Sequence, residues 1–265
     1  MTKLNAVSET PRLDAELLLA FAAGRTRAAV LASPERALDA AAAALFATLL
    51  ERRARGEPLA YLTGEREFFS LPLAVSPDVL IPRAETELLV ELALAIVASA
   101  AQPAVLDVGT GSGAIALAIK RERTDARVTA TDRSAAALAV ARGNAMRLAL
   151  DVRFVESDWF EELGGEVFDV ILSNPPYVRS ADVKGALGFE PKLALDGGAD
   201  GLAAYRVLFA EARRRLNAGG SLLIEHGADQ RAELVALAEA RGWRVAAAHD
   251  DLAGRPRVLD LRNGS

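Results

Sequence analysis

The pattern of hydrophobic and polar positions changes twice along the chain, and each change marks a predicted structural boundary. Up to about residue 62 the pattern is that of helices. One predicted helix covers 11–24 and ends at Gly24; a second covers 33–56, with Ser33 as N-cap, Pro34 in the first turn and Gly56 at its end. Residues 1–62 are therefore predicted to form a small helical domain.

Residues 63–82 interrupt the helical pattern. This segment is rich in aromatic and β-favouring residues and contains Pro72, Pro77 and Pro82, which favours a short β-hairpin over a helix. We interpret it as a linker between two domains. Helical spacing returns over 83–100 and opens the predicted second domain, residues 83–265.

From residue 101 onwards, predicted strands alternate with helices. The strands cover 104–109, 127–132, 152–157, 168–173 and 221–227, and a helix with a glycine stop is expected over 201–220. Such alternation indicates parallel strands with helices on both faces of the sheet. A terminal antiparallel pair over 243–263 completes the prediction: an α/β, Rossmann-like, mostly parallel seven-stranded sheet with a small N-terminal helical domain.

Composition and charge narrow the functional classes. With 265 residues, of which 51% are hydrophobic, the chain can bury one sizeable core beside a smaller domain. Residues 1–75 hold nine basic and nine acidic residues, so the net charge of −5 lies entirely in the rest of the chain. Sequence-independent binding to a phosphate backbone needs clustered Lys and Arg. We therefore expect no stable nucleic-acid partner.

Other residue types bear on metals, redox chemistry and location. The chain has no cysteine and only two histidines, which are far apart, so disulfides and thiolate chemistry are excluded and a metal site is not expected. The first residues do not fit a signal peptide, and no apolar run approaches the ~20 residues of a bilayer span. We expect a cytoplasmic monomer with no membrane partner.

A glycine-rich loop follows the first strand of the second domain. In "LDVGTGSGAIAL" the glycines occupy the turn from strand to helix, where backbone N–H groups can approach a ligand closely. Their spacing differs from the G-x-G-x-x-G of dinucleotide binders. A tight turn without a ligand is the simpler alternative. Cofactor contacts are assigned to the whole loop, Gly109, Thr110, Gly111, Ser112 and Gly113.

Two further strand ends carry candidate cofactor residues. Asp132 ends the second strand, where its carboxylate can accept hydrogen bonds from both ribose hydroxyls. Asp158 and Trp159 follow the third strand, where they can accept from an adenine amine and stack on the base. Alternatively, Asp132 could cap the helix near Ser134, and Trp159 could fill the core. Together these residues predict a nucleoside site without a diphosphate cradle, which suits S-adenosylmethionine better than NAD.

The order and spacing of several motifs resemble the HemK/PrmC family of release-factor glutamine N5-methyltransferases. They are "LDVGTGSGAIAL", Asp132, "SDWF", "SNPPYV", "FEPKLALDGGADGL" and "IEHG", and the match covers essentially the whole chain. The resemblance implies a class I S-adenosylmethionine-dependent methyltransferase that modifies the glutamine of the Gly-Gly-Gln motif in class I peptide chain release factors and yields S-adenosylhomocysteine. It also implies that the helical domain helps to hold the substrate. Ala84 departs from the family's usual proline, which adds backbone freedom without removing a polar group.

The stretch "SNPPYV" is explained by the chemistry that the resemblance implies. A glutamine nitrogen is a poor nucleophile, so positioning has to supply much of the rate. Asn174 and the Pro175 carbonyl would each accept one amide N–H, Pro175 and Pro176 would stiffen the backbone, and Tyr177 would wall the substrate. Catalysis is assigned to Asn174, Pro175 and Tyr177, substrate binding to all four residues, and cofactor contact also to Asn174. A simple turn ahead of proline is the structural alternative for Asn174.

Other assignments stay open at this stage. The N-P-P-Y tetrad is shared with adenine-N6 and other amino-group methyltransferases, so a nucleic-acid amino (adenine-N6 or guanine-N2) methyltransferase is the alternative enzyme and a nucleoside-binding regulatory module the non-enzymatic one. Glu225 and His226, at the end of the next strand, are interpreted as structural. Arg83, Glu85 and Thr86 fit a substrate entrance and a helix-start network equally well.

Overall fold

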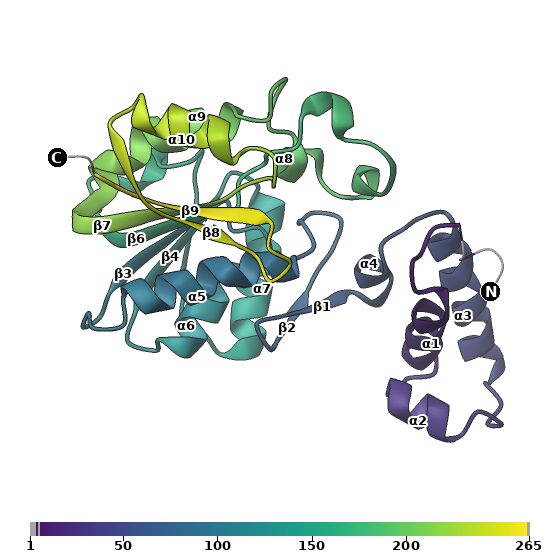
Figure 1. The fold of residues 1–265 in the computed structure, drawn as a ribbon. Coiled ribbons are helices and arrows are strands. Elements are labelled where there is room, and N and C mark those ends of the chain that lie inside the picture. The colour runs from purple at the N-terminus through teal and green to yellow at the C-terminus, as the bar shows by residue number, and fades with distance from the viewer. Residues whose placement is uncertain (1–3, 5, 264–265) are drawn as a thin grey trace. The chain divides into compact units, whose positions relative to one another are not determined.

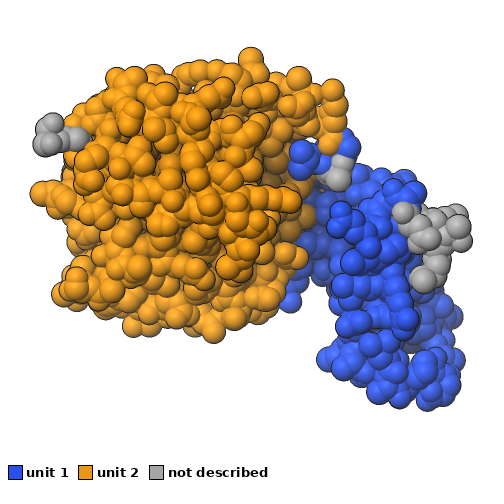
Figure 2. Space-filling view, in the orientation of Figure 1, with its two compact units in different colours: residues 1–65, 185–189 blue, residues 66–184, 190–265 orange. Residues whose placement is uncertain are grey.

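The structure, a computed structural model, describes residue 4 and residues 6–263. Packing divides the chain into two compact units, shown in different colours in Figure 2. The first unit consists of residues 1–65 together with 185–189, and the second of residues 66–184 and 190–265. All the candidate cofactor and catalytic residues belong to the second unit.

The first unit is helical. Leu18, Leu49 and Leu62 form its buried centre, and Gly24 takes the left-handed conformation expected after the first helix, with φ of 60°. Its described helices are α1 (Pro11–Ala22), α2 (Arg27–Ala32), α3 (Ala40–Ala54) and α4 (Leu59–Thr63).

Helix α3 begins later than predicted. The expected helix over 33–56 was wrong in its first part, because Ser33 directly follows α2 and ends it. Asp39 is the N-cap of α3, and its carboxylate accepts a hydrogen bond of 2.8 Å from the N–H of Ala42. A negative charge at this position also interacts favourably with the helix dipole, which favours a start at Ala40.

The second unit is built around a seven-stranded sheet in the order β5-β4-β3-β6-β7-β9-β8 (Figure 1). Strands β3 to β7 pair in parallel, β9 pairs antiparallel with β7, and β8 pairs antiparallel with β9. This confirms the predicted mostly parallel, Rossmann-like sheet and its terminal antiparallel pair. The strands are β3 (Ala104–Val108), β4 (Arg127–Asp132), β5 (Arg153–Glu156), β6 (Phe168–Ser173), β7 (Leu216–Glu225), β8 (Trp243–Asp250) and β9 (Pro256–Asn263).

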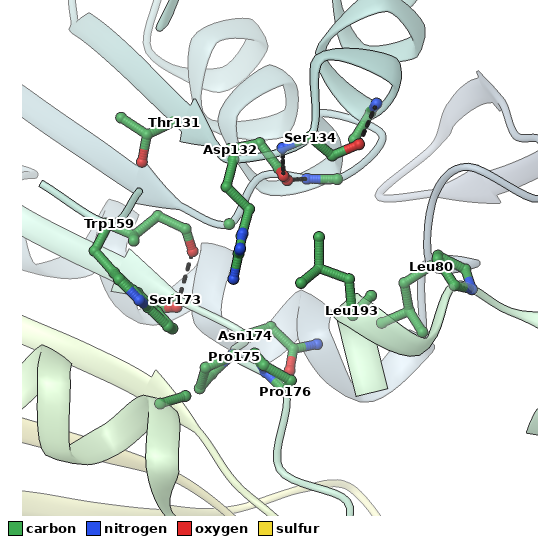
Figure 3. A pocket seen from close by; sticks show the side chains of 18 of the residues that line it. Leu80, Thr131, Asp132, Ser134, Trp159, Ser173, Asn174, Pro175, Pro176 and Leu193 are labelled. Atoms are coloured by element: carbon green, nitrogen blue, oxygen red, sulfur yellow. Dashed lines mark hydrogen bonds between the residues drawn. The ribbon is translucent and has the colours of Figure 1, made fainter. Parts of the chain in front are cut away.

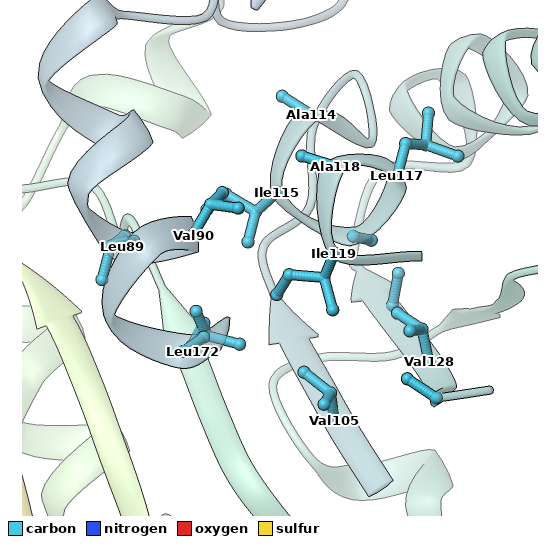
Figure 4. Packing of buried hydrophobic residues seen from close by; sticks show 14 of the residues in the cluster. Leu89, Val90, Val105, Ala114, Ile115, Leu117, Ala118, Ile119, Val128 and Leu172 are labelled. Atoms are coloured by element: carbon cyan, nitrogen blue, oxygen red, sulfur yellow. The ribbon is translucent and has the colours of Figure 1, made fainter. Parts of the chain in front are cut away.

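Helices cover both faces of this sheet (Figure 1). One face carries α5 (Glu87–Ile96), α6 (Ala114–Glu122) and α7 (Ala135–Leu148), and the other carries α9 (Ala203–Glu211) and α10 (Arg231–Glu239). Since successive strand residues point to opposite faces, Val105 belongs to the same core cluster as Val90 and Ile119 (Figure 4), whereas Leu106 lies in the cluster that contains Tyr205. Burial on both faces explains the continuous apolar runs of these strands.

The helix expected over 201–220 is shorter than predicted. α9 ends at Glu211, a 3-10 helix covers Ala212–Arg215, and β7 already begins at Leu216. Leu216 pairs with Phe168 of β6, so strand pairing overrides the helical tendency of this stretch. Among the described helices, none combines the length and apolar character that a membrane span requires.

The segment 63–82 contains the predicted hairpin, formed by β1 (Glu65–Phe68) and β2 (Leu71–Ala74). Its apolar side chains Phe68, Leu71 and Leu73 are buried in the core of the second unit. The Asn144 side chain on α7 accepts a hydrogen bond from the N–H of Ala74 at 2.8 Å and donates one to its carbonyl at 3.0 Å. Residues 66–82 are therefore packed into the second unit, although the sequence suggested a linker.

Candidate functional site

The candidate site lies where β3, β4, β5 and β6 end. In the sheet, β4 and β5 lie on one side of β3 and β6 on the other, so the strand order reverses here, which is the usual ligand position in open α/β sheets. A pocket of about 330 Å³ opens at this edge (Figure 3). The predicted site residues that line it are Gly109, Gly111, Asp132, Asp158, Trp159, Asn174, Pro175 and Pro176.

The glycine loop turns away from β3 through left-handed backbone conformations. Gly109 and Gly111 have φ values of 76° and 56°, which residues with a Cβ rarely adopt. The N–H groups of Gly109 and Thr110 both donate to the carbonyl of Thr131 at 2.9 Å, which fastens the loop to the end of β4. Because Gly109 and Gly111 have no side chains, the loop exposes their backbone directly to the pocket.

Thr110, Ser112 and Gly113 support the loop and do not line the pocket. The Ser112 carbonyl accepts a hydrogen bond of 2.9 Å from the side chain of Asn144. Gly113 is the N-cap of α6, and a Cβ there would lie only 3.2 Å from the Cβ of Ala141. The third glycine thus permits close packing of α6 against α7, a different role from the predicted ligand contact.

Beneath Thr110 lies Asp107, a buried carboxyl group that sequence reasoning missed. Its Oδ2 accepts hydrogen bonds from the Thr110 hydroxyl at 2.6 Å and from the N–H of Ala116 at 3.3 Å, while Oδ1 has no partner among the described residues. Burial raises the pKa of Asp107 to about 7, against the two hydrogen bonds, which lower it. The sequence feature that could have identified Asp107 is a single acidic residue inside the apolar strand "AVLDV".

Asp132 holds the glycine loop and also lines the pocket. Its Oδ2 accepts the N–H of Gly111 and its Oδ1 the N–H of Ser134, both at 2.9 Å. Ser134 itself caps α7, since its hydroxyl accepts the N–H of Ala137 at 3.1 Å. Burial raises the pKa of Asp132, whereas these backbone hydrogen bonds lower it. An ionised carboxylate has further lone pairs, so Asp132 can accept ligand hydroxyls while it supports the loop.

Asp158 and Trp159 reach the pocket from the end of β5. Asp158 is exposed to solvent. Trp159 is half-buried, has a left-handed φ of 54°, and packs against the core while it lines the pocket. The Trp159 ring therefore packs against the core, as in the alternative interpretation, and also lines the pocket, as predicted (Figure 3).

One wall of the pocket is formed by two loops that were not predicted from the sequence to belong to the site. Residues 78–80 follow the hairpin, and residues 191–196 include the short helix α8 (Lys192–Leu195). Leu80 and Leu193 point into the pocket from these loops and give it an apolar side (Figure 3). The second loop lies within "FEPKLALDGGADGL", which suggested the family but no particular contact.

Asn174 follows the end of β6 and has an oriented side-chain amide. Its Nδ2 donates a hydrogen bond of 3.1 Å to Oγ1 of Thr86. Its Oδ1 is buried and has no hydrogen-bond partner in the described part of the chain. A buried acceptor without a partner is costly, so this oxygen is available to a ligand donor.

The backbone of the tetrad rests on two glycines of the "DGGADG" loop. A Cβ on Gly197 would lie 2.8 Å from the Pro176 carbonyl oxygen, and one on Gly201 would lie 2.6 Å from the Tyr177 carbonyl oxygen. The side chain of Gln230 also donates to the Tyr177 carbonyl, at 3.2 Å. These contacts fix the backbone to which the Asn174 side chain is attached.

Tyr177 packs against the core instead of lining the pocket. Its hydroxyl lies 3.5 Å from Oε1 of Glu225, which is longer than the roughly 2.5–3.0 Å of an ordinary O–H···O hydrogen bond. Burial raises the pKa of Tyr177 to about 12, and the nearby carboxylate of Glu225 acts in the same direction. The phenol therefore stays neutral at physiological pH.

The residues whose roles the sequence left open have different surroundings in the structure. Arg83 forms an ion pair with Glu190, and Glu85 is exposed. Thr86 is buried, and its hydroxyl bonds Asn174 while making no helix-cap hydrogen bond, so neither sequence interpretation describes it. His226 is buried with a pKa lowered by burial, and its Nδ1 lies 2.8 Å from the Gly227 carbonyl oxygen.

Sequence models of two families match this chain. The PrmC N-terminal domain matches residues 2–64 and the methyltransferase small domain residues 84–190. The release factor glutamine methyltransferase of Burkholderia pseudomallei is 49% identical, covering 97% of this chain and 93% of its own. The protein of the same name from Escherichia coli is 46% identical over 84% of this chain and 82% of its own.

Solved structures share the fold at lower identity. A methyltransferase from Pyrococcus furiosus has a TM-score of 0.55 and 20% identity, covering 74% of this chain and 91% of its own. The Thermus thermophilus 16S rRNA N2 G1207 methyltransferase also has a TM-score of 0.55, with 18% identity over 75% of this chain and 49% of its own. These likenesses support the Rossmann-like methyltransferase fold. Since the far more similar relatives match nearly end to end, the chain belongs to the release factor glutamine methyltransferase family.

Proposed function

We propose that this protein transfers a methyl group from S-adenosylmethionine to the side-chain amide nitrogen (N5) of the glutamine in the Gly-Gly-Gln motif of class I peptide chain release factors. The names of its relatives support release factor glutamine as the acceptor. The Gly-Gly-Gln context follows from the resemblance of the site motifs to the family.

The observation that carries this proposal is the unpartnered Oδ1 of Asn174 at the wall of the pocket. A primary amide of the substrate has two N–H donors, and this oxygen can accept one of them. The Asn174 amide is oriented with Nδ2 toward Thr86, to which one of its two N–H groups donates, so the group that is left without a partner is the oxygen. The site is therefore set to receive a donor, as a glutamine side-chain nitrogen is.

The pocket residues fit S-adenosylmethionine. A volume of about 330 Å³ lies within the range of small-molecule sites. Asp132 offers a carboxylate to ribose hydroxyls, and Trp159 offers a ring to the base. Thr131 also lines the pocket, and its buried hydroxyl oxygen has no partner within the described residues. When bound, S-adenosylmethionine supplies an electrophilic methyl group on a sulfonium sulfur.

The side chains contribute chiefly by positioning the acceptor. An amide nitrogen shares its lone pair with the carbonyl group, so it reacts only when it is held in line and its pyramidal form is favoured. We assign one N–H of the substrate to Asn174 Oδ1 and the other to the Pro175 carbonyl, while Pro176 limits backbone motion and the Tyr177 ring supports the tetrad from the core. The amide proton lost after methylation can pass to solvent, so this mechanism requires no base.

The test is transfer of labelled methyl groups from S-adenosylmethionine to a purified class I release factor. Parallel samples contain the factor with its Gly-Gly-Gln glutamine changed to alanine, and unmodified DNA and RNA. We expect label on the unmodified factor alone. Label on nucleic acid would favour the amino methyltransferase alternative, and label on no sample would contradict the proposal.

Asn174→Ala separates an enzyme from a nucleoside-binding module. Loss of the amide should lower methyl transfer by about 100-fold or more, because the acceptor nitrogen is no longer aligned. Binding of S-adenosylmethionine, measured by calorimetry, should largely survive. Unchanged transfer by this variant would remove Asn174 from the mechanism.

The proposed substrate also sets the expected partner and location. We propose that the protein acts as a cytoplasmic monomer, where release factors work, and forms no stable complex with nucleic acid. Residues 1–62, predicted from sequence as a separate domain, are proposed to help hold the release factor. Sedimentation of the protein alone and with a release factor tests both stoichiometries.

A further inference from the structure

One buried carboxylate joins the two loops that form the apolar wall of the pocket. Glu190 is only 8% exposed. Its Oε2 accepts a hydrogen bond of 3.0 Å from the backbone N–H of Ile81, and its Oε1 forms the ion pair with Arg83. A carboxylate that is shielded from water needs such partners, and both of its oxygens find them in one short segment, residues 81–83.

The positions of these residues connect the carboxylate to the pocket. Glu190 directly precedes Pro191, and Ile81 directly follows Leu80; both Pro191 and Leu80 line the pocket. Arg83 directly precedes the 3-10 helix Ala84–Thr86 before α5. A displacement of the backbone at residue 81 or 190 would therefore move a residue of the wall.

The loop over 191–196 is held at its two ends. The chain rejoins the second unit at Glu190, because residues 185–189 belong to the first unit. At the other end, the N–H of Val178 donates to the Leu195 carbonyl at 2.9 Å, and the Val178 carbonyl accepts the N–H of Gly197 at 2.8 Å. The helix between these ends, α8, has only four residues and is too short to be stable by itself. Its position therefore depends on its anchors, and Glu190 is one of them.

We propose that Glu190 and Arg83 are positioning residues for the cofactor, which hold Leu80 and Leu193 together as one wall against bound S-adenosylmethionine. Leu193 is 46% exposed and points into the pocket, so a ligand that fills the pocket would cover its apolar surface (Figure 3). The inference rests on the proposed use of this pocket for S-adenosylmethionine. It goes further by assigning the affinity in part to a pair of residues that do not line the pocket.

The physical reason is that the wall is ordered before the ligand arrives. Without the Glu190 carboxylate, the N–H of Ile81 loses its acceptor and the two loops lose the bonds that join them. The ligand would then have to order the loops as it binds, and this loss of conformational freedom lowers the affinity.

The test measures the Kd for S-adenosylmethionine by calorimetry. Glu190→Ala should raise Kd by about tenfold or more, since both bonds to residues 81–83 are lost. Arg83→Met should raise it by about fivefold, because the bond to Ile81 remains, and Arg83→Lys, which keeps a cation, should stay within about twofold.

Lys192→Met is the matched control. It removes an ion pair of 3.4 Å with Asp196 on the same short loop, but the Lys192 side chain is 75% exposed. Exposed ion pairs contribute little, so this variant should keep Kd within about twofold.

Urea unfolding, followed by tryptophan fluorescence, separates positioning from simple support of the fold. A folded Glu190→Ala variant that is less stable but has the Kd of Lys192→Met would overturn the inference. If Glu190→Ala does not fold, equal Kd values for Arg83→Met and Arg83→Lys would overturn it. Failure of the unchanged protein to bind S-adenosylmethionine would refute the proposed use of the pocket and the inference with it. Absence of glutamine methylation by a protein that does bind S-adenosylmethionine would refute only the proposed acceptor, and the Kd comparison would still decide the inference.

Discussion

Replacing the buried Asp107 by asparagine is expected to stabilise the second unit at neutral and alkaline pH. The carboxyl group is fully buried and lacks a partner at Oδ1 within the described chain. An asparagine oxygen can accept the same hydrogen bonds from the Thr110 hydroxyl and the Ala116 N–H. The substitution therefore removes a buried charge and keeps the hydrogen bonds that the carboxylate makes.

The magnitude follows from the pKa of Asp107, which burial raises from 3.8 to about 7. Below pH 3.8 the carboxyl group is protonated in both the folded and unfolded chain and has no effect. Between pH 3.8 and about 7 only the unfolded chain loses the proton, so stability falls as pH rises. The whole loss is roughly 4 kcal/mol, of which roughly 3 kcal/mol develops between pH 5 and 8.

The assay is urea unfolding at pH 5 and pH 8, followed by tryptophan fluorescence. Both tryptophans of the chain, Trp159 and Trp243, lie in the second unit, so the signal reports on its unfolding. The advantage of Asp107→Asn in the free energy of unfolding should grow by roughly 3 kcal/mol between the two pH values. An advantage of equal size at pH 5 and pH 8 would show that ionisation of Asp107 does not destabilise the folded protein.

Asp125→Asn is the matched control. The hydrogen bond with Arg123 lowers the pKa of Asp125 to about 2. Its contribution to stability is present above pH 3.8 and is lost only as the pH falls toward 2. The effect of Asp125→Asn should therefore be the same at pH 5 and pH 8.

Further substitutions test the cofactor site and the tetrad. Asp132→Ala should weaken S-adenosylmethionine binding by ~1–3 kcal/mol in calorimetry, because a charge-assisted acceptor and the Gly111 anchor are both lost; unchanged affinity would make Asp132 a purely structural residue. Gly201→Ala places a Cβ 2.6 Å from the Tyr177 carbonyl and should destabilise by ~1–3 kcal/mol more than Gly254→Ala, which has a similar positive φ but open space; equal losses in urea unfolding would contradict this. Tyr177→Phe should leave kcat within about threefold, since the hydroxyl lies at 3.5 Å from Glu225; a larger loss would show that the hydroxyl matters.

The local pattern of hydrophobic and polar residues was sufficient to predict most of the helices and strands and the candidate site residues. Strands such as β6 were predicted to the residue, because a buried parallel strand is a continuous apolar run bounded by polar residues. Parallel strands also end at one edge, so Asp132, Trp159 and Asn174 could be assigned to one site before the strand order was known. Errors arose at element ends, as at α3, where Ser33 and Asp39 both had the chemistry of an N-cap.

Only the tertiary structure decided which residues support that site. Thr86 and Asn174 are 88 residues apart, and their hydrogen bond depends on how the 3-10 helix before α5 packs against the ends of β6 and β7. The burial that raises the pKa values of Glu225 and Asp107 likewise depends on the helices that cover both faces of the sheet. Periodicity and turn chemistry act over a few neighbouring residues, whereas desolvation and side-chain orientation depend on all the elements that surround a group. The sequence therefore indicated the candidate ligand-binding groups, and the folded structure alone determined how they are oriented and charged.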